Sequence, residues 1–369
     1  MNERSSRNIR FGDAPPQPPV RTKAPNAVRV IPRLAYALKA QLLKISHPAP
    51  AAPMIPAPDQ VKRLLAIQLE HLGDLVLTEP TLRALRMHYP DAERVLIAPP
   101  FATNLFAGTG WGKILPPEAL QDVADRKLGF DLAVDLTGRV EYRIAKMLAR
   151  SGIETTIGYD RAGRGVYHTI PLPFPEITVP MREIYIGLAK ALGATASDSI
   201  PRLPHGDDRL RRGRELWRER RIQAPVVIHP GAHLREQRWS IGGFTNLGRA
   251  LKKHGVEVAV LCGPSEKGFS AAIAQCIEAP LVVGPSMMDL MDLVATSRVL
   301  VCNNTGPLHL AAALGVPTVS TMGPAIPWRW WPVSEAPQIV FRAGSQGAIA
   351  DMELLDPLEM AAAVLHLLD

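Results

Sequence analysis

From Lys62 onward, the chain alternates short apolar runs, rich in leucine and β-branched residues, with stretches of helical periodicity. Up to about residue 200, strands are expected at 63–69, 94–98 and 131–135, and helices at 75–88, 140–151 and 181–193, the last of which links to the next segment. Strands that alternate with helices are typical of βαβ units. This half of the chain therefore predicts a parallel sheet covered on both faces.

The same alternation begins again after a strongly basic helix expected at 207–220. Strands are expected at 225–229, 257–262, 281–283, 299–302 and 317–321, and helices at 243–254, 268–276, 288–296, 306–314 and 356–368. Two such runs predict an α/β protein with two Rossmann-like domains, over 61–200 and 201–355, and a terminal helix over 356–369. Ligands of open α/β sheets bind beyond the carboxyl ends of the strands, so a cleft between two facing domains is the expected site.

The first 60 residues differ from the rest in composition. Five prolines within residues 1–26 oppose helix and central strand, so this segment is expected to be disordered and to join no sheet. A Pro/Ala stretch over 47–58 indicates a linker. Between them, apolar residues at helical spacing over 31–45 predict a short basic amphipathic helix. Such a helix either attaches to an anionic membrane surface or packs on the body of the protein, and the sequence leaves both open.

Charge and composition narrow the class of protein. Residues 1–60 contain nine Lys and Arg against three acidic residues, and thus +6 of the net charge of +7. A nucleic-acid enzyme would spread its basic residues over folded domains, so no nucleic-acid partner is expected. The three cysteines lack paired spacing, no apolar run approaches the roughly 18 residues of a membrane span, and the N-terminus has no secretory apolar core. We therefore expect a cytoplasmic globular protein.

The first candidate site follows the first predicted strand, within residues 64–80. A buried strand runs into a tight turn at Gly73, and Asp74 stands at the start of the next helix, facing the expected cleft. Asp is also a preferred N-cap residue, so the same position fits a purely structural helix cap.

The second candidate site follows the strand expected at 225–229. The sequence Pro-Gly-Ala after it exposes backbone N–H groups with little side-chain obstruction, and Arg235 and Arg238 follow within seven residues of Gly231. Backbone amides and arginines suit a diphosphate. An ordinary loop with solvated arginines fits the same pattern.

The third candidate site lies where a predicted strand meets the helix at 306–314. Asn304 and Thr305 can hydrogen-bond a ribose or a phosphate, Gly306 permits close backbone approach, and the helix N-terminus favours an anion. The same polar residues also serve as helix caps, and His309 fits a core position in an apolar helix. No GxGxxG, Walker A, GxSxG or HExxH motif occurs in the chain.

Three segments in this order, LGDLVLTEPTLRAL (72–85), HPGAHLREQRW (229–239) and NNTGPLHLAAALGVP (303–317), resemble glycosyltransferase family 9, the lipopolysaccharide heptosyltransferases. DLAVDLTG (131–138) and IGYDRAGRG (157–165) add to the likeness, which covers about residues 62–345. The resemblance implies a GT-B fold and metal-independent, inverting transfer of a heptose from ADP-heptose. The implied acceptor is a lipid A-core saccharide, a glycolipid at the inner membrane.

The resemblance also implies roles for particular residues. Asp74 stands at the catalytic-base position of the family, and Glu266 lies where such enzymes often contact the ribose of the donor. The other implied donor-binding positions are Gly231, Ala232, His233, Arg235, Gln237, Arg238, Asn304, Thr305, Gly306, Pro307 and His309. No metal and no other cofactor is implied, and the chain has no DxD motif.

Two positions depart from the family pattern. Gln237 stands where the family usually has Lys, and Asn304 stands where it usually has Asp. The first change removes a cation near the diphosphate, for which Arg235 or Arg238 is a substitute of different geometry. Alternatives are therefore a relative that uses another nucleotide-sugar or a capsule or protein acceptor, and a non-catalytic binding protein held at the membrane by its basic tail. Retention of Asp74 argues against the last.

Overall fold

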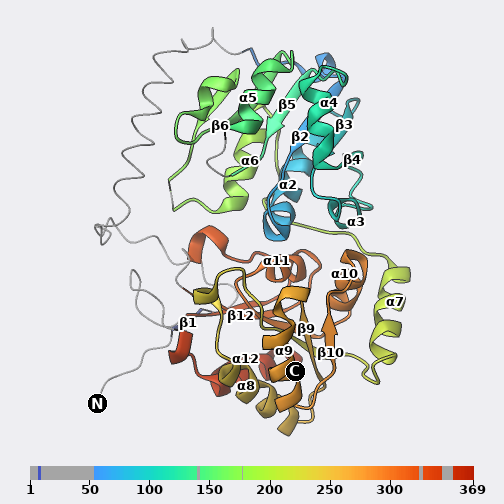
Figure 1. Ribbon diagram of the computed structural model, residues 1–369, viewed down its shortest axis with the longest axis vertical. Coiled ribbons are helices and arrows are strands. Elements are labelled where there is room, and N and C mark those ends of the chain that lie inside the picture. The colour runs from blue at the N-terminus through green and yellow to red at the C-terminus, as the bar shows by residue number, and fades with distance from the viewer. Residues whose placement is uncertain (1–6, 10–53, 139–141, 177, 324–326, 343–351) are drawn as a thin grey trace. The chain divides into compact units, whose positions relative to one another are not determined.

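The computed structural model describes residues 7–9, 54–138, 142–176, 178–323, 327–342 and 352–369 (Figure 1). The chain divides into two compact units between Ser199 and Ile200, and the short strand at 7–9 belongs with the second unit. The helix expected at 31–45, and most of the linker expected at 47–58, lie outside the described residues. Within the described ranges, no helix is both long enough and apolar enough to cross a bilayer.

The N-terminal unit is built on a six-stranded sheet in which every neighbouring pair is parallel. The strand order is β4-β3-β2-β5-β6-β7, with β2 (Arg63–Ile67), β3 (Glu93–Ile97), β4 (Lys113–Leu115), β5 (Leu132–Asp135), β6 (Thr155–Asp160) and β7 (Ile170–Pro173). The helices are α2 (Leu72–His88), α3 (Ala102–Leu105), α4 (Leu120–Ala124), α5 (Arg143–Arg150) and α6 (Met181–Ala191). Four consecutive residues of β2, 64–67, are buried, because helices cover both faces of a parallel sheet.

The C-terminal unit has a seven-stranded sheet in the order β1-β13-β12-β11-β8-β9-β10. Its strands are β1 (Arg7–Ile9), β8 (Val226–His229), β9 (Val258–Cys262), β10 (Leu281–Val283), β11 (Val299–Asn303), β12 (Thr318–Thr321) and β13 (Gln338–Arg342). Its helices are α7 (Asp207–Arg218), α8 (Ile241–Lys253), α9 (Lys267–Cys276), α10 (Met287–Ala295), α11 (Gly306–Ala313) and α12 (Pro357–Leu368). The pairs among β8 to β13 are parallel, and β1 is antiparallel to β13.

The basic helix α7 packs closely on α10 because Gly213 has no side chain. A Cβ at this position would lie 2.2 Å from the carbonyl oxygen of Asp292. The buried Trp217 donates from Nε1 to the carbonyl of Leu293 at 3.1 Å, and Arg209 Nε lies 2.6 Å from Asp292 Oδ1. Part of the positive charge of α7 is therefore neutralised within the unit.

The predicted fold class, two Rossmann-like α/β domains with parallel sheets, is confirmed. All the expected strands and helices after Lys62 appear at nearly the expected bounds. The strands β4, β6, β7 and β13 were not among the predictions. The structure also differs from the expectation that residues 1–26 join no sheet, because β1 pairs with β13 and places Asn8 opposite Phe341. Residues 7–9 precede the first proline, Pro15, so their backbone amides are free to pair.

Candidate active site

Asp74 lies in the first turn of α2, shortly after the carboxyl end of β2. The N-cap residue of this helix is His71, so Asp74 is the third helical residue and does not occupy the N-cap position. The positive end of the helix dipole favours a carboxylate in the first turn. Asp74 Oδ1 accepts a hydrogen bond of 2.7 Å from the hydroxyl of Tyr185 on α6. The carboxylate thus has a defined partner, while its role as a base stays a prediction.

Polar residues next to this pair fix the loop between β2 and α2. Gln68 is fully buried, and its Nε2 donates to the carbonyl of Leu136 at 3.1 Å. Its Oε1 accepts from the backbone N–H of Glu70 at 3.2 Å. Burial and the nearby charges of Asp74 and Glu70 raise the pKa of Tyr185 well above its usual value. The phenol therefore stays protonated and remains a hydrogen-bond donor.

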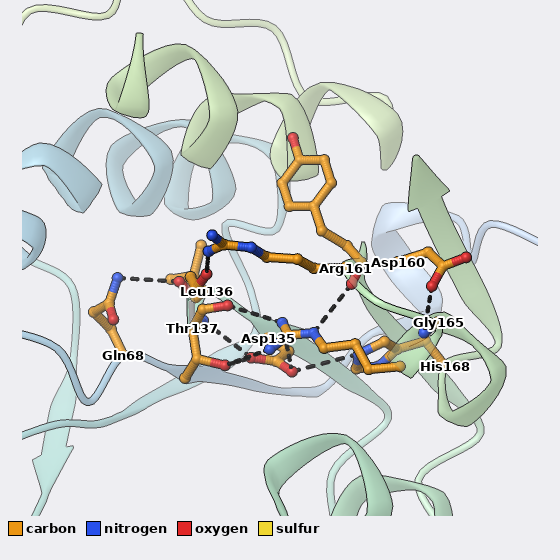
Figure 2. A network of polar contacts seen from close by, with 11 residues as sticks. Gln68, Asp135, Leu136, Thr137, Asp160, Arg161, Gly165 and His168 are labelled. Atoms are coloured by element: carbon orange, nitrogen blue, oxygen red, sulfur yellow. Dashed lines mark hydrogen bonds and ion pairs between the residues drawn. The ribbon is translucent and has the colours of Figure 1, made fainter. Parts of the chain in front are cut away.

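A second, fully buried network joins the ends of β5 and β6 (Figure 2). Arg164 Nη2 lies 3.2 Å from Asp135 Oδ2 and donates to the carbonyl of Thr137 at 2.8 Å. Arg164 Nε donates to the carbonyl of Tyr159 at 3.1 Å. His168 Nε2 lies 3.4 Å from Asp135 Oδ2, and the Thr137 hydroxyl donates to Oδ1 at 2.5 Å. This network holds the two loops that follow β5 and β6.

The network keeps a carboxylate ionised inside the domain. Burial alone would raise the pKa of Asp135, but the nearby His168 and the charge of Arg164 bring it below its usual value. Arg161, the residue directly after β6, donates from Nη1 to the carbonyl of Gly138, and Figure 2 shows its side chain extending towards the loop after β5. None of these residues was among the predicted site residues. The sequence feature that could have identified them is the presence of Asp135 in the segment 131–138 and of Arg164 in the segment 157–165.

In the C-terminal unit, three loops lie at one edge of the sheet because they follow the neighbouring strands β9, β8 and β11. Asn303, the last residue of β11, is fully buried and fixes the loop after β8. Its Nδ2 donates to the carbonyls of Pro230 at 2.8 Å and Gly231 at 3.2 Å. Its Oδ1 accepts from the backbone N–H of Trp239 at 3.0 Å and from the hydroxyl of Thr321 at 2.8 Å. Asn303 was not among the predicted site residues, although an amide side chain at the end of a buried apolar strand indicates a buried hydrogen-bonding role.

Two predicted donor-binding residues from different motifs are in contact. A Cβ at Gly231 would lie 2.1 Å from Glu266 Oε1, so the Glu266 carboxylate fills the space beside this glycine. Glu266 Oε2 accepts from the backbone N–H of Gly263 at 3.2 Å and lies 3.8 Å from His229 Nε2. Burial lowers the pKa of His229 although Glu266 is close, so the imidazole is neutral near pH 7.

The loop after β11 leads directly into the N-terminus of α11. Thr305 is the N-cap residue, and its hydroxyl donates to the carbonyl of Asn303 at 3.3 Å. Residues 304–307 are all half-buried, and Pro307 in the first turn has no N–H that would need an intrahelical acceptor. The remaining amides of the first turn provide a place for an anion. His309 is 4% exposed and lies in the buried part of the helix.

The basic residues of the second motif differ in their burial. Arg238 is half-buried, and its Nε donates to the carbonyl of Ala232 at 2.9 Å, so its guanidinium folds back onto its own loop. Ala232 is buried, Gln237 is half-buried, and His233 and Arg235 are exposed. The structure therefore brings Ala232 and Arg238 together and leaves His233 and Arg235 at the surface of the unit.

Two Rossmann-like domains with a carboxylate at one helix start, and with glycine loops and a helix N-terminus at the edge of the second sheet, are typical of glycosyltransferases of the GT-B class. The sequence profile of Glycosyltransferase family 9 (heptosyltransferase) matches residues 126–359, more than half of the chain. The chain belongs to this family and is a glycosyltransferase.

Relatives agree with this assignment. Lipopolysaccharide heptosyltransferase 3 of Escherichia coli is 25% identical over 325 residues, which are 80% of this chain and 94% of that protein. The crystal structure of a family 9 glycosyltransferase from Veillonella parvula superposes with a TM-score of 0.72 at 19% identity, covering 83% of this chain and 97% of that one. The structure of E. coli ADP-heptose lps heptosyltransferase II gives 0.70 at 20% identity, with 83% and 98% covered. These structures share the GT-B fold of this chain.

Proposed function

We propose that this glycosyltransferase moves a heptose from ADP-heptose to a saccharide of the lipopolysaccharide core, with inversion at the anomeric carbon and without a metal ion. The observation that carries the proposal is the half-buried Asp74 carboxylate near the carboxyl edge of the first sheet, held by Tyr185, in a chain of the heptosyltransferase family. The names of the related E. coli proteins, which mention lipopolysaccharide and ADP-heptose, support the acceptor and the donor.

In the proposed reaction, the acceptor hydroxyl oxygen attacks the anomeric carbon of the heptose while the bond from that carbon to the ADP oxygen breaks. Asp74 takes the hydroxyl proton, and ADP leaves with the bonding electron pair. A single displacement from the face opposite to the leaving group inverts the configuration. A positioned general base contributes about 10²–10⁴ to the rate.

The C-terminal unit would bind the nucleotide and stabilise the leaving diphosphate. Backbone amides after β8 and in the first turn of α11 favour negative charge where it develops. Glu266 is suited to accept hydrogen bonds from ribose hydroxyls. Among the described residues, no group of three or more His, Cys, Asp or Glu side chains could hold a metal ion.

The same proposal locates the enzyme in the cytoplasm, on the inner face of the inner membrane, where a lipid-linked acceptor would meet it. The basic residues before Lys62 support this location, because anionic lipid attracts Lys and Arg near its surface.

A panel of nucleotide-sugars tests the donor. Calorimetry against ADP-, UDP-, GDP- and dTDP-sugars should show tight binding of the ADP compound, and ADP-heptose should support transfer to a core saccharide. Preference for another base would assign a different donor, for which the departures at Gln237 and Asn304 would be the first residues to revert. Binding without transfer to any acceptor would favour the non-catalytic alternative.

A further inference from the structure

We infer that Tyr185 is a positioning residue for this transfer, whose hydroxyl holds the Asp74 carboxylate in the orientation that takes the acceptor proton. The inference rests on the proposed role of Asp74 as the base. It adds a residue that lies outside all three sequence motifs and 111 positions away from Asp74.

The geometry gives Tyr185 little freedom. Helix α6 packs along α2, and the tyrosine side chain is 1% exposed. Its hydroxyl donates to Asp74 Oδ1 at 2.7 Å. An aromatic side chain has only two rotatable bonds, so packing of the ring fixes the direction in which the hydroxyl donates. Asp74 itself is half-buried, so the residue stays partly accessible to solvent while this bond restrains it.

The groups around the phenol maintain it as a donor. Burial, Asp74 and Glu70 all oppose ionisation of Tyr185, and together they outweigh Gln68, which acts in the opposite direction. The cation Arg161 also interacts with Tyr185 and with Glu70. Because Tyr185 is fully buried beside two carboxylates, it stays neutral over the pH range in which Asp74 would act.

The substitution Tyr185→Phe removes the hydroxyl and keeps the ring. A hydrogen bond to an ionised carboxylate favours its ionised form. Its loss should therefore move the acid limb of the pH profile of kcat/KM to higher pH, by about one unit. A carboxylate that is no longer held in place should also lower kcat about tenfold, while KM for the donor stays within about twofold.

Tyr159→Phe is the matched control. Tyr159 is also a buried tyrosine, and its hydroxyl donates to the carbonyl of Ile184 at 2.5 Å, on the same helix α6. Both substitutions remove one buried phenol bond: in Tyr185→Phe it is the bond to Asp74, and in Tyr159→Phe it is the bond to the Ile184 carbonyl. Tyr159→Phe should keep kcat and the acid limb of the wild type even if its Tm falls.

A second variant removes the dependence on how well Tyr185→Phe folds. Replacing Tyr185 with 3-fluorotyrosine keeps the shape and makes the hydroxyl a stronger donor, so the acid limb should move to lower pH, opposite to the effect of phenylalanine. An acid limb that stays in place in both variants, or that moves equally in Tyr159→Phe, would overturn the inference.

Asp74→Asn separates this inference from the proposed function. If Asp74→Asn loses transfer and Tyr185→Phe shifts the profile, both stand. If Asp74→Asn loses transfer while the profile of Tyr185→Phe is unchanged, only the role of Tyr185 fails. If Asp74→Asn transfers heptose at the wild-type rate, the base assignment fails and the role of Tyr185 fails with it.

Discussion

Gly231 is the residue at which a single methyl group should disturb donor binding most directly. A Cβ there would lie 2.1 Å from Glu266 Oε1 and 2.2 Å from both Cδ and Oε2. Van der Waals contact needs about 3.5–4.0 Å, so Gly231→Ala forces the Glu266 side chain to move. The backbone can stay in place, because the obstacle is the end of a flexible side chain.

The displaced carboxylate loses its hydrogen bond from the Gly263 backbone N–H, which is 3.2 Å long. A hydrogen bond of this kind at a partly exposed site contributes about 1–2 kcal/mol, so the free energy of unfolding should fall by no more than that. Binding of ADP should weaken about tenfold, because Glu266 would no longer be placed for the ribose.

Calorimetry with ADP and urea melts of four variants, Gly231→Ala, Gly268→Ala, Glu266→Ala and the Gly231→Ala/Glu266→Ala double variant, would measure this effect. Gly268→Ala is the control. Gly268 lies in the neighbouring helix α9, and a Cβ at this position would meet no atom within 4 Å. This control should leave the Kd for ADP unchanged and raise stability by about 0.5–1 kcal/mol. In a Glu266→Ala background, Gly231→Ala should change neither the Kd for ADP nor the free energy of unfolding, because the side chain that the new Cβ would meet is absent. An unchanged Kd in Gly231→Ala, or an equal cost in both backgrounds, would refute the reasoning.

Other parts of the chain give further predictions. Arg164→Met leaves the buried Asp135 carboxylate without its guanidinium and should lower the free energy of unfolding by about 3–5 kcal/mol at pH 7.5. In the wild type, the ionised Asp135 carboxylate stabilises the fold at pH values above its unfolded pKa of about 3.9, and this contribution is lost as the pH falls through its lowered folded pKa. In Arg164→Met, protonation relieves the unpaired charge, so the deficit in urea melts should be smaller at pH 5 than at pH 7.5; equal deficits would contradict this. Transfer should persist in EDTA, and complete loss with recovery on Mg²⁺ would contradict the proposed stabilisation of ADP. Glu in place of Arg33, Lys39 and Lys44 should reduce co-sedimentation with anionic liposomes at low salt, since each basic residue near such a surface contributes about 1 kcal/mol; unchanged binding would favour packing of residues 31–45 on the body.

Strong periodicity explains why most of the fold was predictable from the sequence. The strands β2, β8 and β11 are continuous apolar runs followed by helices, and this is the pattern of parallel sheets buried on both faces. The strand β7 (Ile170–Pro173) was missed because it contains two prolines, which an edge strand tolerates and a central strand does not. The strand β6 (Thr155–Asp160) begins with two threonines and contains a glycine, so it lacks a clear apolar run.

The candidate site was predictable only where the backbone itself carries the signal. Glycines after strands and a Pro in the first turn of a helix identify Gly231 and Pro307 from the sequence. Side chains that act through distant partners give no such signal. In the sequence, Tyr185 resembles the apolar residues that α6 buries. Its contact with Asp74 arises only when α6 packs along α2. Asn303 was passed over for its neighbour, because which of two adjacent amides points inward depends on the register of β11.

The central claim is that Asp74 removes the acceptor proton while other residues bind the donor. Asp74→Asn tests it most directly, through the single-turnover rate of heptose transfer and the Kd for ADP-heptose, with Tm as the check on folding. We predict a rate about 10²–10⁴ lower than that of the wild type and a Kd within about twofold of it. A wild-type rate in a folded Asp74→Asn protein would contradict the account and leave Asp74 with a structural role in the first turn of α2.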